Sequence, residues 1–137
     1  MSEPKGRGAA WTEERGTSDE GREHPESGPE ASEQNDLELY DLRVTVDSVG
    51  GRPVCGLAVG DYFEVTESSR LRLPPGGHFC IYALAAALPL LPAKQRQLPA
   101  ADWLERDCLV ACPDPEERLV MRITRTVRRT MRSSDLT

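Results

Sequence analysis

Alternation of apolar and polar residues predicts strands at three places in the chain. Residues 42–48, 62–66 and 119–127 each carry an apolar side chain at every second position, the period of a half-buried strand. Arg125 is the exception on the inner face of the last strand, and residues 70–73 read as a short extended piece. The predicted inward-facing residues are Leu42, Val44, Val46, Phe63, Val65, Leu119, Met121, Ile123 and Val127.

The pattern changes between the second and third strands. Residues 78–88 combine helix-forming residues with apolar side chains on nearly all faces, which predicts a largely buried helix ended by Pro89 and Pro92. Residues 99–106 predict a second, shorter helix with proline in its first turn. We therefore expect an α+β fold with a small, mostly antiparallel sheet or open barrel. Its first and last strands should pair, because each has one apolar face to cover.

Composition divides the chain into three parts. Residues 1–35 carry nine acidic against four basic residues and almost no aliphatic side chains, so we expect a disordered acidic tail. A single domain is expected over residues 36–129, and a frayed C-terminus over 130–137. This tail lacks the apolar core of a secretory signal, and no stretch is long enough to span a membrane. The expected location is the cytoplasm, with no membrane partner.

Charge argues against nucleic-acid binding. The chain has a net charge of −6 at pH 7 and only 5% aromatic residues. A run of arginines free of acidic residues occupies the C-terminal strand, at Arg118, Arg122, Arg125, Arg128, Arg129 and Arg132. We interpret it as a solvated strand face, since a nucleic-acid surface would also need interleaved aromatic side chains and a basic domain.

The four cysteines carry the strongest chemical hypothesis. No Cys-x-x-Cys occurs, so neither a zinc ribbon nor a thioredoxin-type pair is indicated. Cys55 and Cys112 lie in predicted turns, and Cys80 lies in the first turn of the predicted helix, just after His78. If these turns meet the helix start, the three sulfurs and His78 make a tetrahedral site for zinc or copper. Cys108 lies outside this group.

Alternatives to a metal site stay open. Free cysteine packs as a small hydrophobic residue, so the cysteines could fill the core, and a redox sensor is a third reading. Cys80 is the candidate nucleophile, because a helix dipole lowers the pKa of a thiol at its N-terminus. Asp61 and Asp114 are weaker candidates, as acid–base groups, because turn capping accounts for both.

The motifs in combination resemble a family of small bacterial proteins of uncharacterised function. They are Cys55-Gly56-Leu57, Gly60-Asp61-Tyr62-Phe63, the Pro75-Gly76 turn that leads to Cys80, and Cys112-Pro113-Asp114. The resemblance covers residues 42–128 and implies a fold and candidate positions, without a reaction. Two function hypotheses follow: a metal-binding or thiolate-dependent accessory protein of bacterial metabolism, or a non-catalytic interaction module with structural cysteines. A protein partner, a small molecule or self-association would suit either.

Overall fold

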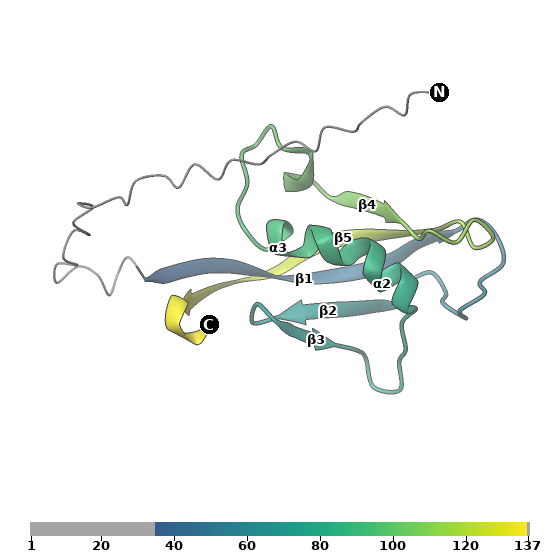
Figure 1. The fold of residues 1–137 in the computed structure, drawn as a ribbon, viewed down its shortest axis with the longest axis horizontal. Coiled ribbons are helices and arrows are strands. Elements are labelled where there is room, and N and C mark those ends of the chain that lie inside the picture. Colours follow the sequence, from purple (N-terminus) through teal and green to yellow (C-terminus); the bar gives the residue numbers. More distant parts are fainter. Residues whose placement is uncertain (1–34, 137) are drawn as a thin grey trace, which may run out of the picture.

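The computed structural model describes residues 35–136, so nearly all of the predicted acidic tail lies outside the described residues. Within them the chain forms strands, short helices and single 3-10 turns, in an α+β arrangement (Figure 1). The elements are β1 (Asp36–Val49), β2 (Tyr62–Thr66), β3 (Arg70–Arg72), α2 (Ile81–Ala87), η1 (Leu88–Leu90), α3 (Leu91–Lys94), η2 (Trp103–Glu105), β4 (Cys108–Ala111), β5 (Leu119–Arg132) and η3 (Ser133–Asp135). None of the helices among residues 35–136 is long and apolar enough to cross a membrane.

The described strands form one open, five-stranded antiparallel sheet in the order β3-β2-β1-β5-β4. The two 14-residue strands β1 and β5 pair along their whole length, from Asp36 opposite Arg132 to Val49 opposite Leu119. The predicted fold class and the pairing of the first and last strands are therefore confirmed. Residues 130–136, expected as a frayed end, complete this ladder and add η3, because β1 begins early enough to pair with them.

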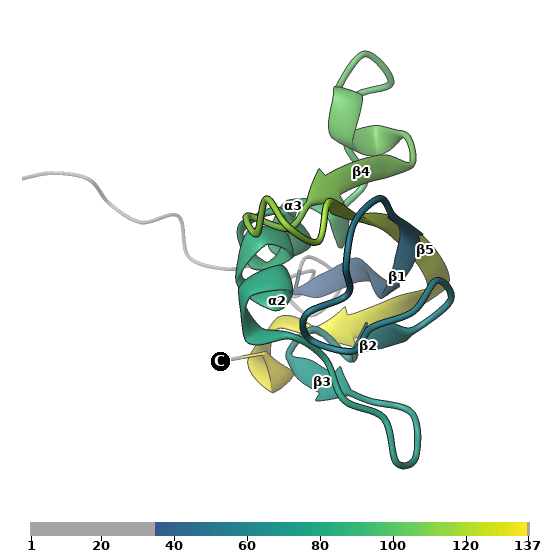
Figure 2. The same cartoon turned by 90° about the vertical axis from the view of Figure 1, so that its right-hand side faces the viewer.

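Helices α2 and α3 lie against one face of the curved sheet (Figures 1 and 2). The core fills the space between them, and it includes every predicted inward-facing residue except Val127. Between Leu42 opposite Arg125 and Tyr40 opposite Arg128, β5 has one residue more than β1. That extra residue reverses the alternation of faces, so Val127 is 48% exposed while Arg125 remains on the inner side. The prediction for Val127 was wrong for this reason.

The helical region differs from its prediction in its start, its end and its burial, and in the length of the second helix. It begins at Ile81 rather than residue 78, and it continues to Lys94 through two prolines. Each proline occupies the first turn of the next helical segment, where no N–H donor is required, so neither ends the helical path. Only Ala83 and Ala87 of α2 are fully buried, so the helix covers the core with one face. The second predicted helix is reduced to the single turn η2.

A buried lysine secures the loop around η2. The side chain of Lys94 is 1% exposed, and its ammonium donates hydrogen bonds to the carbonyl oxygens of Leu104, Glu105 and Arg106. Arg125 forms a bidentate ion pair with the Glu105 carboxylate, at 2.6 and 2.8 Å, and donates to the Lys94 carbonyl at 2.9 Å. These contacts tie the η2 loop to the end of α3 and to β5.

Candidate functional site

Two loops meet at one end of the sheet. The β1–β2 loop (residues 50–61) leaves the end of β1, and the β4–β5 turn (residues 112–118) enters the start of β5. Because β1 and β5 are antiparallel neighbours, these loops are adjacent, and their main chains pair further: Gly51 N–H donates to the Glu117 carbonyl at 2.9 Å. A side chain at Gly51 would place Cβ 1.9 Å from the Glu116 carbonyl oxygen, so only glycine permits this approach.

The Glu117 carboxylate lies at the centre of this meeting point. Its side chain is 1% exposed. One oxygen, Oε1, accepts a hydrogen bond from the Cys55 N–H at 2.7 Å, and Oε2 lies 3.7 Å from the Cys112 sulfur. Hydrogen bonds from the Cys55 thiol and from its main chain lower the pKa of Glu117. The group is therefore a carboxylate at neutral pH that holds a residue of each loop.

The thiols of Cys55 and Cys112 remain protonated at neutral pH. Burial, followed by the hydrogen bond to Glu117, raises the pKa of Cys55 to about 12. Burial is also the main cause that raises the pKa of Cys112. Cys80 is the N-cap residue of α2 and packs against the same core as these two cysteines. Cys55, Cys80, Cys112 and Glu117 are called the thiol cluster below.

The charge of Glu117 has no cationic partner in residues 35–136. No lysine, arginine or histidine of the described chain forms an ion pair with it. The neighbouring Arg118 turns away and donates to the Gly50 carbonyl at 2.7 Å. Buried charges in proteins are as a rule paired or bound to metal ions. A buried carboxylate whose partners in residues 35–136 are thiols and the main-chain N–H groups of Val54 and Cys55 is therefore unusual.

The fourth predicted ligand, His78, and the remaining cysteine, Cys108, lie outside the thiol cluster. His78 approaches the cluster through the main chain: its Nε2 lies 2.9 Å from the Cys55 carbonyl oxygen, and the ring is exposed. Cys108 is buried in β4 opposite Ile123, and burial is the main cause that raises its pKa. In the described part of the chain, no three His, Cys, Asp or Glu side chains are already arranged to hold a metal ion.

The two candidate acid–base carboxylates hold turns. Asp61 accepts the Ala58 N–H at 2.9 Å, and Asp114 accepts the Glu116 N–H at 2.9 Å. The Asp114 main-chain N–H also hydrogen bonds to the Cys112 sulfur and opposes the rise of its pKa. Each aspartate thus shapes a loop that carries a cysteine of the thiol cluster.

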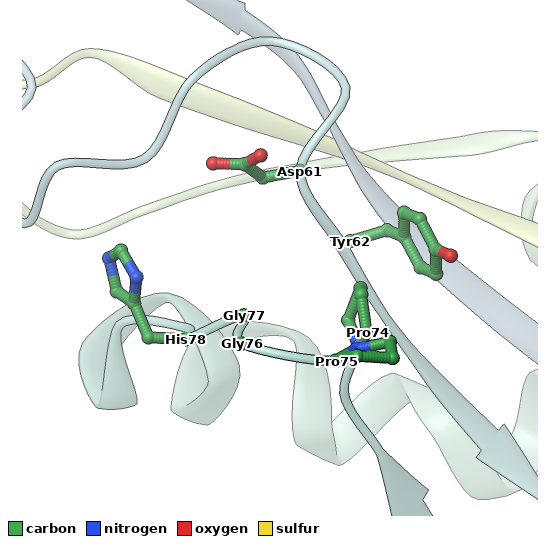
Figure 3. Close-up of a pocket in the computed structure, with 7 residues that line it drawn as sticks. All are labelled: Asp61, Tyr62, Pro74, Pro75, Gly76, Gly77 and His78. Carbon is green, nitrogen blue, oxygen red and sulfur yellow. The ribbon is translucent and has the colours of Figure 1, made fainter.

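A separate cavity of about 370 Å³ adjoins the β1–β2 loop (Figure 3). Asp61 and Tyr62 line one side of it, and the turn of residues 74–78 lines the other. His78 belongs to this wall, so its exposed ring lies at the cavity while its Nε2 contacts the main chain of Cys55.

The arginine run of β5 is largely neutralised. Arg122 pairs with Asp47, Arg125 with Glu105, Arg128 with Glu38, and Arg129 with Asp41. Three of these acidic partners come from β1, which lies beside β5 throughout. The paired residues lie far apart along the chain, so the sequence does not indicate these ion pairs, although it does predict that the two strands pair.

Glu117 is the residue that the sequence did not single out. It follows three turn-forming residues and another glutamate, a context typical of a solvated turn. Only the approach of the β1–β2 loop buries it. Comparisons of the chain with protein-family models, curated proteins and solved structures gave no match, so its function is argued from this geometry.

Proposed function

We propose that this protein binds a thiophilic metal ion, copper(I) or zinc, at the thiol cluster. The observation that carries the proposal is the buried Glu117 carboxylate, which contacts two cysteines and has no cation partner among residues 35–136. A cation at this point would supply the missing positive charge. The sulfur donors around it select a soft ion, because thiolates prefer copper(I) and zinc to hard cations such as magnesium or calcium.

Binding exchanges protons for the ion. Each thiol that becomes a ligand releases its proton to solvent, and the metal–sulfur bond replaces the hydrogen bond to Glu117. Because the pKa values of Cys55 and Cys112 are raised, protons compete strongly, and affinity should increase with pH across the neutral range. Cys55 and Cys112 already contact one carboxylate. Rotation of their side chains, with Cys80 as a third sulfur, would enclose the ion.

The alternative function is a protein-interaction module in which the cysteines only pack. The observation that favours it is apolar surface beside α2 and β3. A groove there is lined by Leu71, Leu84, Leu88 and Leu91, and the side chain of Ile81 is 69% exposed. In that case Glu117 is a tether between two loops, and the cluster takes up no metal.

Metal titration of matched cysteine variants separates these functions. We expect the reduced, full-length protein to take up copper(I) stoichiometrically under anaerobic conditions, in competition with a chromogenic chelator, and zinc in a parallel titration. Cys55→Ser and Cys112→Ser should each weaken binding by at least about tenfold, the loss typical when a metal site is perturbed. Cys108→Ser is the control, because it removes a buried thiol outside the cluster.

Circular dichroism and thermal unfolding confirm that each variant is folded before its affinity is compared. In Glu117→Gln, the glutamine side-chain oxygen can still accept the Cys55 N–H, but the negative charge is removed. This variant should therefore also weaken the metal complex. If the folded wild type takes up neither ion, or if Cys108→Ser loses as much affinity as Cys55→Ser, the metal-binding proposal is wrong.

A further inference from the structure

The cavity at Asp61 is a second candidate site, formed by residues outside the thiol cluster. It lies between the start of β2 and the turn of residues 74–78, as Figure 3 shows. Its volume of about 370 Å³ falls at the small end of the range for pockets that bind small molecules.

The cavity wall carries one negative charge and no positive charge. Asp61 is half-buried, and the Ala58 N–H occupies only its Oδ2. No lysine or arginine lines the cavity, and Asp61 forms no ion pair within the described residues. The nearby Arg43 stacks on the Tyr62 ring at 4.4 Å but is paired with Glu64 at 2.7 Å, so it does not neutralise Asp61.

His78 adds a second acceptor. The Cys55 carbonyl oxygen can only accept a hydrogen bond, so the Nε2 of His78, 2.9 Å away, carries the hydrogen. In the neutral ring, Nδ1 is then an acceptor. The remaining wall combines an apolar part, the Tyr62 ring with Pro74 and Pro75, with the main chain of Gly76 and Gly77.

Both walls are fixed by the main chain before any ligand arrives. On one side the Asp61 carbonyl accepts the Val46 N–H at 2.8 Å, which ties the loop to β1. On the other, Gly77 N–H donates to the Pro74 carbonyl at 2.8 Å, and Gly76 has a φ of +72°. This is the geometry of a type II turn with proline and glycine at its two central positions. The acceptors are therefore preorganised, which reduces the entropy lost on binding.

From these features we infer that the cavity binds a small organic ammonium ion. The charged head would donate hydrogen bonds to the Asp61 carboxylate and the His78 ring, and a short alkyl body would contact Pro74, Pro75 and Tyr62. Carboxylate and phosphate ligands are disfavoured, because they would meet a like charge with no cation to balance it. An inorganic cation would leave the apolar wall without a partner.

Amide chemical shifts of the full-length protein test the inference. Titration with n-butylammonium chloride should give saturable shifts in residues 58–62 and 74–78, whereas sodium butyrate and sodium chloride at equal ionic strength should not. Asp61→Asn retains the oxygen that accepts the Ala58 N–H and removes the charge, so the dissociation constant should rise at least about tenfold, as expected for loss of a charge-assisted contact. Glu116→Gln, a change of an exposed carboxylate outside the cavity, should leave it unchanged.

Shifts that rise linearly without saturation, an equal response to butyrate or to sodium chloride, or unchanged affinity in Asp61→Asn would each overturn the inference. The titration needs no metal at the thiol cluster, so its outcome is independent of the proposed metal function.

Discussion

Replacement of Lys94 by methionine tests how the η2 loop is held. The substitution keeps a long, unbranched side chain in the core but removes the ammonium that contacts three carbonyl oxygens. The Leu104 carbonyl, 2.8 Å from the ammonium, would lose its donor in a buried position, which costs about 1–3 kcal/mol. The carbonyls of Glu105 and Arg106 are partly accessible to water and should add less than about 1 kcal/mol together.

One opposing effect reduces this loss. Burial lowers the pKa of Lys94, and the charge of Arg125 lowers it further. Both effects mean that the buried ammonium lowers the stability of the folded protein, and the methionine variant removes this unfavourable contribution. We expect a net destabilisation of about 2 kcal/mol, which corresponds to a decrease in Tm of about 8–16 °C for a domain of this size. The ion pair between Arg125 and Glu105 does not involve the Lys94 side chain, so the variant reports on the lysine alone.

Urea unfolding followed by circular dichroism measures the change, and hydrogen exchange of residues 98–107 shows whether the loop is its source. Arg96→Met is the matched control, since the exposed Arg96 donates to the Pro92 carbonyl alone among residues 35–136 and should change stability by less than about 0.5 kcal/mol. An unchanged or higher urea midpoint in Lys94→Met would refute the reasoning, because burial of the ammonium would then cost as much as its hydrogen bonds return.

Two further predictions concern the β1–β2 loop, which carries Cys55 of the thiol cluster. Gly51→Ala would place Cβ 1.9 Å from a main-chain oxygen, so we expect a loss of at least about 2 kcal/mol in urea unfolding. Gly50→Ala, whose Cβ would lie 3.2 Å from the Arg118 Cβ, should cost clearly less, and equal losses would contradict the argument. Above pH 9 the unfolded chain loses the Cys55 proton while the folded protein keeps it up to about pH 12, so stability should fall as pH rises through this range. Urea midpoints over this range should show a shallower decline in Cys55→Ser, and an identical decline would argue against a raised Cys55 pKa.

Three of the strands could be predicted because their signal is local, whereas β4 (Cys108–Ala111) was not predicted. Alternation in residues 42–48 and 62–66 shows which face is buried, and the burial of Val44 and Phe63 agrees with it. The pattern does not show where two paired strands lose register. Val127 was misplaced because the extra residue in β5 depends on how that strand meets β1 around Asp41.

The predicted helix boundaries were wrong for a related reason. Proline removes one donor and clashes with the preceding turn only inside a helix. Local sequence does not decide whether Pro89 and Pro92 lie inside one helix or at the first turns of successive segments. Packing of Leu91 and Lys94 against the sheet and the η2 loop decides it.

By itself, the sequence determined three of the strands, the pairing of the first strand with the last, and the placement of three cysteines and a histidine in turns or at a helix start. Periodicity and turn chemistry are properties of neighbouring residues, so they can be read along the chain. Only the tertiary structure decided that Glu117 is buried between Cys55 and Cys112, and that His78 lies at a cavity beside Asp61. These groups meet because antiparallel pairing of β1 with β5 brings together loops separated by some sixty residues. The burial of a side chain and the neutralisation of its charge depend on which distant residues surround it, so neither can be read from the local sequence.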